Sequence, residues 1–270
     1  MPKVSVIIPT YNRAATLAAA ISSVLNQTEK DLEVLVCDDG STDNSREIVM
    51  ALANFDNRVK WLELGYNSGL PAVPRNLGIK QASGEWLAFL DSDDEWLPEK
   101  LSQQLIALAN SSSLACATNA FLSDDSVMLK LKEENKIINF RDLISNNKIV
   151  ASSVLLSGLF FRKDKLFFSE DIKLKAVEDY DLWLRVAVLS NFIYLEQPLV
   201  RYNDSSPDSI RTKQPLKSFL QKRKIMWSLF QYLNEQKKFK EYFFCLGYQI
   251  IINEFIIIKA SLGWIVRLFK

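Results

Sequence analysis

Three carboxylates, Asp91, Asp93 and Asp94, follow directly after a short apolar run. The run 86–90 predicts a buried strand that opens onto these acidic side chains at its carboxyl end. Carboxylates held close together repel each other unless a cation or hydrogen-bond donors offset their charge. An Asp-X-Asp pair at a strand end can turn its oxygens toward one point, as a hard divalent cation with a diphosphate ligand requires. The pattern alone leaves two interpretations open, a metal and diphosphate site or a solvated acidic loop that caps a helix expected near Pro98.

The 270-residue chain contains no histidine. It therefore lacks the usual general base at neutral pH and the usual zinc ligand. Acid–base chemistry must fall to Asp, Glu, Lys, Tyr or Cys, and a bound metal is expected to take oxygen ligands. The three cysteines, Cys37, Cys116 and Cys245, are far apart and odd in number, which suggests no disulfide framework and fits a reducing, cytoplasmic environment.

Strand and helix patterns alternate through the first hundred residues. We expect strands over residues 4–8, 32–37, 59–64 and 86–90, and helices over residues 13–26, 45–53 and 75–82. Repeated strand–helix units with short connections favour a parallel sheet with helices on both faces, and ligands of such sheets bind beyond the carboxyl ends of the strands. Polar turns at 9–12, 38–43 and 91–94 follow three of these strands, so we expect them to meet at one edge of the sheet.

The pattern loosens after residue 105. A strand is expected over residues 154–161, a helix over 176–189 and a further strand over 192–195. The polar segment 204–214, which contains Pro207, is a plausible boundary loop. We therefore expect one α/β domain over residues 1–210 and a helical extension over 211–270.

The extension differs from the rest of the chain in charge and in its aromatic content. Residues 211–270 carry twelve Lys and Arg against three Asp and Glu, while the whole chain has a net charge of only +1. The mostly apolar stretch 242–269 is interrupted by too many polar residues for a membrane-spanning helix. Basic flanks and the aromatic residues Trp227, Tyr232 and Trp264 are typical of helices that lie at a membrane surface, although packing on the domain or on a second subunit stays open.

Five stretches in this order and spacing resemble glycosyltransferase family 2, whose members are inverting enzymes with the GT-A fold. They span about residues 3–205 and are 4–13 (VSVIIPTYNR), 38–43 (DDGSTD), 75–78 (RNLG), 91–94 (DSDD) and 178–185 (EDYDLWLR). Five linked motifs are far more specific than any one of them. The resemblance implies a GT-A fold with a mostly parallel central sheet flanked by helices, in which 1–105 is the nucleotide-binding half and 106–210 the acceptor-binding half.

The resemblance also implies the residues that bind the donor. The nucleotide-sugar would contact Pro9, Thr10, Tyr11, Arg13, Asp38, Asp39, Arg75, Asp91, Ser92 and Asp94. A tyrosine ring offers a face on which a base can stack, a carboxylate can accept a base N–H, and the arginine fork suits phosphate or ribose oxygens. For Tyr11 a capping role, for Asp38 a turn-forming role and for Arg75 a surface position remain alternatives.

The same resemblance implies a divalent metal, Mn²⁺ or Mg²⁺. Asp93 would be its direct ligand and Asp91 a further contact. Many family members carry an Arg-X-His near the end of the domain whose histidine can complete the metal shell, whereas this chain has Arg201-Tyr202-Asn203. Asn203 is therefore the expected third metal contact, which suits Mg²⁺ better than tightly held Mn²⁺. Arg201 is available to pair with diphosphate.

On the acceptor side, the resemblance points to the acidic pair Glu178 and Asp179. Asp179 is the expected general base, which takes a proton from an acceptor hydroxyl while the metal stabilises the leaving diphosphate. Trp183 lies one helical turn beyond Asp179, and we expect it to form an acceptor platform, with a core position as the alternative.

The sequence thus predicts an inverting glycosyltransferase that uses a nucleotide-diphosphate sugar, with UDP as the expected nucleotide, and a glycan or lipid-linked acceptor in surface polysaccharide synthesis. No nucleic-acid partner is expected. Peripheral membrane contact or a homodimer through residues 216–270 is expected, with the protein in the cytoplasm at the inner face of the cell membrane. A polyprenyl-phosphate glycosyltransferase and a non-catalytic nucleotide-binding or scaffold protein are the alternatives.

Overall fold

The computed structural model describes residues 2–128, 135–145, 147, 149–203 and 215–247. It contains two compact units, residues 1–212 and residues 213–270. The expected boundary loop at 204–214 and the apolar segment from residue 248 onward lie outside the described residues.

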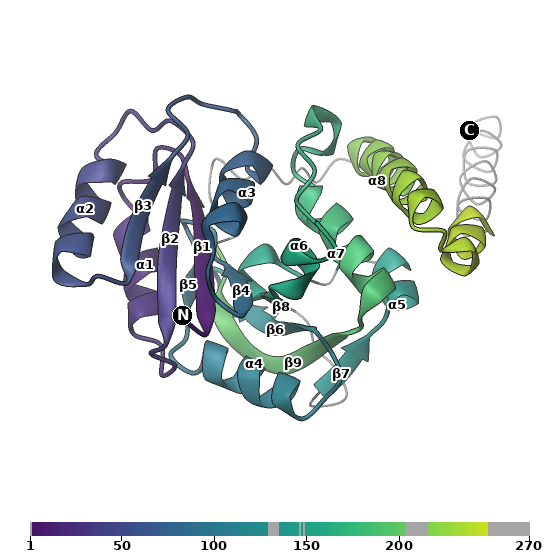
Figure 1. Cartoon of the computed structure of the whole chain (residues 1–270), viewed down its shortest axis with the longest axis horizontal. Helices are drawn as coiled ribbons and strands as arrows, with labels where there is room; N and C mark the ends of the chain where they lie inside the picture. Colours follow the sequence, from purple (N-terminus) through teal and green to yellow (C-terminus); the bar gives the residue numbers. More distant parts are fainter. Residues whose placement is uncertain (1, 129–134, 146, 148, 204–214, 248–270) are drawn as a thin grey trace, which may run out of the picture. The chain divides into compact units, whose positions relative to one another are not determined.

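Within the described part of the first unit, nine strands form one sheet. They are β1 (Val4–Thr10), β2 (Leu32–Asp38), β3 (Val59–Glu63), β4 (Trp86–Phe89), β5 (Glu95–Trp96), β6 (Ala115–Phe121), β7 (Asn135–Ile138), β8 (Leu155–Ser157) and β9 (Phe192–Arg201). Their order is β3-β2-β1-β4-β8-β6-β9-β5, and β7 pairs with β9. The long ladders β1–β2, β2–β3, β1–β4 and β6–β9 are parallel, which confirms the mostly parallel sheet (Figure 1).

Helices cover both faces of this sheet. They are α1 (Leu17–Leu25), α2 (Ser45–Phe55), α3 (Ala72–Gln81), α4 (Lys100–Ala109), α5 (Phe140–Ser145), α6 (Leu159–Arg162) and α7 (Glu178–Leu189). Alternate residues of a strand point to opposite faces. Val6 and Ile8 therefore pack in one cluster with residues of α1, α2 and α4, whereas Ile7 contacts α3 on the other face.

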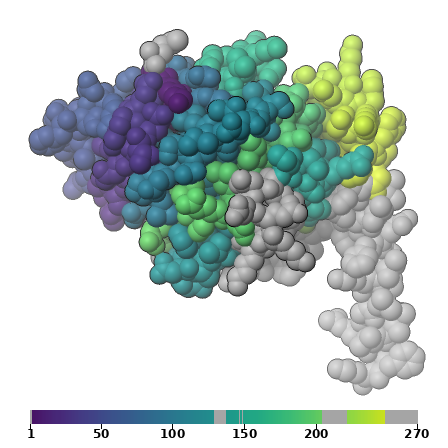
Figure 2. All heavy atoms as spheres, turned by 90° about the horizontal axis from the view of Figure 1, so that it is seen from below, coloured from purple at the N-terminus to yellow at the C-terminus, as the bar shows by residue number. Residues whose placement is uncertain are grey.

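The two halves of the sheet are joined through β8, which pairs antiparallel with both β4 and β6. In Figure 2, purple and blue spheres of the first half adjoin teal and green spheres of the second. Parallel strands β1, β2 and β4 end at the same edge, so the turns after Thr10, Asp38 and Phe89 lie together there.

The strands expected in the first hundred residues are confirmed, but one later strand is wrong. Residues 154–161 hold only the short strand β8, followed by α6. The hydroxyl of Ser157 accepts the backbone N–H of Leu159, and the guanidinium of Arg162 folds back close to Gly158. The backbone N–H groups of Phe161 and Arg162 donate to the carbonyl oxygen of Gly158, so the apolar run turns there into a helix instead of continuing as a strand.

In the second unit, α8 (Pro215–Glu235) is followed by further helical residues at 239–247. The rings of Phe230 and Tyr242 hold these two segments together, with their centroids 5.1 Å apart. Over the described parts of the chain, the helices are all too short or too polar to cross a bilayer.

Gly78 lets α3 approach the sheet closely. A Cβ built on this residue would lie 2.6 Å from Cγ2 of Ile7 and 2.8 Å from Sγ of Cys37, closer than real contacts allow. Both side chains are fully buried in the centre of the parallel strands. Gly78 therefore determines how near α3, and with it Arg75, lies to the sheet edge.

We predict that Gly78→Ala destabilises the protein by about 1–3 kcal/mol, because the extra methyl group overpacks the helix–sheet contact. Helix propensity alone predicts the opposite sign, since Ala exceeds Gly by about 1 kcal/mol in a helix interior. Urea denaturation measures the difference. Gln81→Ala, on an exposed position of the same helix, is the control and should change stability by less than about 0.5 kcal/mol. A stabilised Gly78→Ala protein would contradict the close approach of α3.

Candidate active site

A cavity of about 420 Å³ opens at the carboxyl ends of β1, β2 and β4. Both halves of the first unit contribute to its wall. Most of the residues expected from the sequence line it: Pro9, Thr10, Tyr11, Arg13, Asp39, Arg75, Asp91, Ser92, Asp93, Glu178, Asp179 and Asn203. Residues as far apart in the chain as Pro9 and Asn203 thus form one site.

The turn after β1 is fixed by the turn after β2. Asn12 has a positive φ of 51° and donates its backbone N–H to Oγ of Ser41 over 2.9 Å. Its side-chain Oδ1 accepts the N–H of Thr42 over 2.8 Å, and Oδ2 of Asp43 accepts the N–H of Ala14 over 2.9 Å. These bonds hold the segment 9–13 as one wall of the cavity.

Asp39 and Thr10 form the deep part of this wall. The carboxylate of Asp39 accepts the backbone N–H groups of Ser68 and Gly69 over 2.8 and 3.2 Å, so it also fixes the loop that follows β3. The hydroxyl oxygen of Thr10 is buried and makes no hydrogen bond among the described residues. This hydroxyl group therefore stays available at the cavity wall. Tyr11 is 43% exposed, which leaves its ring available for stacking.

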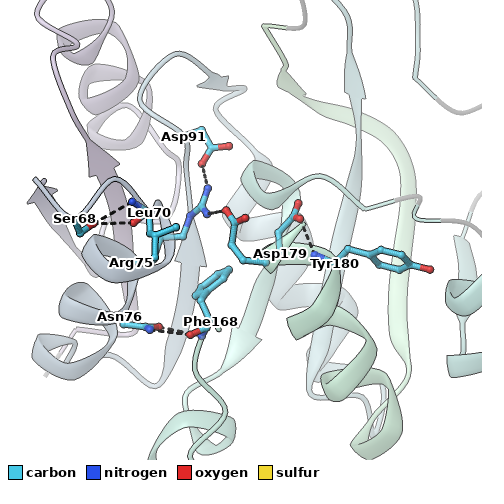
Figure 3. Close-up of polar contacts among 9 residues, drawn as sticks. Ser68, Leu70, Arg75, Asn76, Asp91, Phe168, Asp179 and Tyr180 are labelled. Atoms are coloured by element: carbon cyan, nitrogen blue, oxygen red, sulfur yellow. Dashed lines mark hydrogen bonds and ion pairs between the residues drawn. The ribbon is translucent and has the colours of Figure 1, made fainter. Parts of the chain in front are cut away.

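Arg75 lies at the centre of the site and connects its two halves (Figure 3). Its Nη2 donates to Oδ1 of Asp91 over 2.7 Å, and its Nη1 donates to Oε1 of Glu178 over 2.9 Å. Arg75 and Glu178 are both buried, while the Asp91 side chain keeps 30% of its surface exposed. The alternative that Arg75 is a surface residue is therefore excluded. The residue ties α3 of the first half to α7 of the second.

The surroundings of the guanidinium keep it charged. Burial by itself would lower the pKa of Arg75, but the charges of Asp91, Glu178 and Asp179 raise it above its usual value. The guanidinium also lies over the ring of Phe168, 5.2 Å from its centroid. Asn76 exchanges two hydrogen bonds with the backbone of Phe168 and so holds that ring in place (Figure 3).

Asp94 supports the acidic turn from behind and does not line the cavity. It is 1% exposed, and its carboxylate accepts the hydroxyl of Ser152 and the backbone N–H of Asn203. Burial raises the pKa of Asp94 well above its usual value, and the neighbouring charge of Asp91 acts in the same direction. The Asp94 side chain, expected near the donor sugar, is therefore engaged by Ser152 and Asn203 outside the cavity lining.

Asp38 likewise does not line the cavity. Its carboxylate accepts the backbone N–H groups of Gly40 and Ser41. Asp38 therefore has the turn-forming role that was the alternative to a donor contact.

The acidic pair Glu178 and Asp179 begins α7 and faces the cavity from the second half. The N-terminus of a helix carries a partial positive charge, which favours carboxylates in the first turn. Ala176, two residues before Glu178, has a φ of 73°, so the chain turns sharply into the helix. Oε2 of Glu178 is buried without a hydrogen bond among the described residues, which leaves an acceptor oxygen at the cavity wall.

Two further expectations, one for the acceptor and one for the donor, are wrong. Trp183 is fully buried against the rings of Phe89, Phe168 and Phe192, with centroids 5.9–6.3 Å apart, so it is a core residue and cannot act as an acceptor platform. Arg201 pairs with Asp125 over 3.1 Å at the surface and does not line the cavity. It is therefore not placed to bind diphosphate.

The sequence missed several residues of the wall. Lys175 and Ala176 precede the acidic pair, and Tyr202 precedes Asn203. The sequence offered one signal for these three residues. They stand next to predicted site residues on irregular segments, and such neighbours often line the same cavity. Asn67 and Leu70 come from the loop after β3, where the sequence offered no motif.

The residues at this site are of the chemical types that bind a hard divalent cation. Asp91, Asp93 and Asn203 bring oxygen donors to one cavity, as Mg²⁺ and Mn²⁺ prefer. One oxygen of Asp91 is already bound to Arg75. Among the described residues no group of three or more His, Cys, Asp or Glu side chains is arranged to hold a metal. A cation here would therefore need oxygen ligands from a bound diphosphate and from water as well as from the protein.

Comparison with known proteins gives one family. The family model described as Glycosyl transferase family 2 matches residues 5–166. A similar curated protein, 38% identical over 68% of this chain and 69% of its own, is the UDP-Glc:alpha-D-GlcNAc-diphosphoundecaprenol beta-1,3-glucosyltransferase WfgD of Escherichia coli.

Two solved structures share the fold. The S. aureus TarS fragment 1–349 in complex with UDP-GlcNAc superposes with a TM-score of 0.70 at 22% identity, over 84% of this chain and 66% of that one. The mannosyltransferase PcManGT from Pyrobaculum calidifontis in complex with GDP-Man and Mn²⁺ has a TM-score of 0.59 at 19% identity, over 92% of this chain and 69% of that one.

We predict that Arg75→Met lowers stability by about 3–5 kcal/mol, because it leaves the buried carboxylate of Glu178 without a counter-charge. Adding Glu178→Gln should recover part of this loss, since the double variant buries no unpaired charge. The matched control is Arg58→Met, because Arg58 pairs with Asp56 at a partly exposed position. Such pairs contribute at most about 1 kcal/mol. Urea denaturation measures the free energy of unfolding of both arginine variants. Similar losses of stability in the two variants would contradict the central role of Arg75.

Proposed function

Because the chain belongs to glycosyl transferase family 2, we propose that it transfers a sugar from a UDP-sugar to a hydroxyl group of a lipid-linked saccharide, with inversion at the anomeric carbon. The family membership makes the chain a glycosyltransferase. The observation that supports the finer proposal is the two-sided cavity. A nucleotide-binding wall from the first half faces the carboxylates of Glu178 and Asp179 from the second.

The donor binds along the first wall. Tyr11 stacks on the base, Thr10 and Asp39 supply polar contacts, and Arg13 offers positive charge at the same wall. UDP is the proposed nucleotide because WfgD is named for UDP-Glc and the TarS fragment is solved with UDP-GlcNAc. Arg75 makes no separate donor contact in this proposal. It fixes Asp91 and Glu178 on opposite sides of the donor.

Asp93, with Asp91 and Asn203, would hold the divalent cation. A bound Mg²⁺ or Mn²⁺ ion would offset the charge of the leaving diphosphate. The Mn²⁺ complex of PcManGT, a protein of the same fold, supports this part of the proposal.

Asp179 acts as the general base. Its carboxylate takes the proton of the acceptor hydroxyl as the oxygen forms its bond to the anomeric carbon, and the bond from that carbon to the diphosphate oxygen breaks with its electron pair leaving on UDP. Attack from the side opposite to the diphosphate gives inversion. The N-terminus of α7 fixes Asp179, since one of its oxygens accepts the N–H of Tyr180 over 2.7 Å.

The acceptor is a saccharide attached to a polyprenyl diphosphate, as the name of WfgD states for that enzyme. Lys175 is exposed at the cavity wall four residues before Asp179, so its ammonium group can meet an anionic acceptor at this mouth. Such an acceptor brings the enzyme to a membrane surface. Exposed Trp227 and Phe243 and the basic segment 222–224 of α8 support a peripheral membrane contact, and a homodimer is the alternative.

We predict that Asp179→Asn leaves UDP-sugar binding unchanged and lowers the turnover number by about 10²–10⁴, the usual effect of losing a general base. Single-turnover transfer to a diphosphate-linked saccharide and calorimetry with UDP measure the two quantities. Asp171→Asn is the control, because Asp171 is an exposed carboxylate on the preceding segment that lies outside the cavity. Wild-type turnover in Asp179→Asn would assign the base to another residue.

Removal of the expected metal ligand should abolish the effect of the divalent cation on UDP binding. With Mn²⁺ present, UDP should raise the melting temperature of the wild type by several degrees more than without Mn²⁺, because a ligand that binds only the folded state stabilises it. Asp93→Asn should abolish this metal-dependent part. Asp125→Asn, exposed and outside the cavity, should keep it. An equal UDP shift with and without metal in the wild type would exclude the metal proposal.

A further inference from the structure

Lys100 is a fully buried cation behind the cavity. It begins α4, directly after the strand β5 that carries Trp96. Its Nζ lies over the Trp96 ring, 3.9 Å from the centroid, and donates a hydrogen bond to Oε1 of Gln104 over 2.8 Å. A buried ammonium group lowers the stability of the fold unless hydrogen bonds or other favourable contacts compensate for its lost hydration. The proposed transfer reaction makes no use of this group.

Both contacts of Lys100 lead to the same short segment. The indole Nε1 of Trp96 donates to the carbonyl oxygen of Ser152 over 2.7 Å. The amide Nε2 of Gln104 donates to the carbonyl oxygen of Ser153 over 2.8 Å. These two serines form the end of η1 (Ala151–Ser153), a single helical turn whose first residue lines the cavity.

From η1 the network continues to the acidic turn. The hydroxyl of Ser152 accepts the backbone N–H of Asp91 over 3.0 Å and donates to the carboxylate of Asp94. The other oxygen of Asp94 accepts the backbone N–H of Asn203. One serine side chain thus fixes the first and the last residue of the turn 91–94.

We propose that Lys100 is a positioning residue for the donor site, which holds the turn 91–94 in place through Trp96, Gln104 and Ser152. The ammonium group fixes the plane of the Trp96 ring by a cation–π contact and the amide of Gln104 by a hydrogen bond. These two side chains fix η1, and η1 fixes the carboxylates that face the donor. The proposal rests on the proposed function, because the affinity for the donor is the quantity that depends on the position of the turn 91–94.

The neutralising substitution Lys100→Met tests this role, because Met has a similar length and carries no charge. The measured quantity is the dissociation constant of UDP with Mn²⁺, determined by calorimetry. We expect it to rise roughly tenfold, while the melting temperature at pH 7 does not fall, since the variant no longer buries a charge. Failure of wild-type protein to bind UDP would instead contradict the proposed function, so the two failures are distinguishable.

A control variant separates this effect from a general loosening of the core. Tyr194→Phe removes the buried hydrogen bond from the Tyr194 hydroxyl to Oδ1 of Asn119, which joins β9 to β6, and it should leave UDP affinity unchanged. Should Lys100→Met fail to fold, Trp96→Phe keeps an aromatic face but loses the bond to Ser152 and should weaken UDP binding similarly.

A double-mutant cycle tests the route of the effect. If Lys100 acts through Ser152, then Lys100→Met and Ser152→Ala should weaken UDP binding by less in combination than the product of their separate effects. Additive effects would overturn the route, and unchanged UDP affinity in Lys100→Met or in Trp96→Phe would overturn the proposal itself.

The pH dependence gives an independent measurement. Burial lowers the pKa of Lys100 to about 7. The groups around the ammonium are Trp96 and Gln104, which do not titrate, and the Cys116 thiol, whose pKa burial raises to about 12. UDP affinity of the wild type should therefore weaken as the pH rises from about 6 to 8.5, relative to Lys100→Met. Parallel pH profiles of the two proteins would contradict the positioning role.

Discussion

The buried guanidinium of Arg75 is the interaction on which the rest of the site depends. Two carboxylates, Asp91 and Glu178, point at it from opposite halves of the first unit, and its positive charge offsets theirs. Arginine suits this position because it stays protonated at every physiological pH and offers two parallel donor directions. The close approach of α3 that Gly78 allows brings the guanidinium to the sheet edge.

The cavity belongs to neither half alone. The turns after β1, β2 and β4 provide a wall suited to a nucleotide, because parallel strands deliver their carboxyl ends to one edge. The acidic pair of α7 comes from the other half and carries the proposed base. Holding donor and acceptor on facing walls turns a bimolecular reaction into a positioned one, which is a large part of what such an enzyme must supply.

Polar groups buried behind the site give it rigidity at a cost in stability. Asp94, Ser152 and Lys100 are all buried, and each is held by hydrogen bonds or by an aromatic ring. An apolar core of the same shape would be more stable, but it could not fix the direction of carboxylates at its edge. The loss of stability that accompanies burial of these groups is therefore consistent with a site whose geometry must not vary.

The sequence by itself determined the strands of the first half, the acidic turn and the α7 pair, because apolar runs and turn residues act locally. It also placed most of the wall, since parallel strands leave their ends at one edge. Only the tertiary structure decided the partners of Arg75, which lie 16 and 103 residues away. It also decided that Trp183 is a core residue, because helical spacing puts a side chain on one face but does not say what packs against that face. The roles of Asp94 and Lys100 likewise depend on burial, which is set by the packing of distant segments.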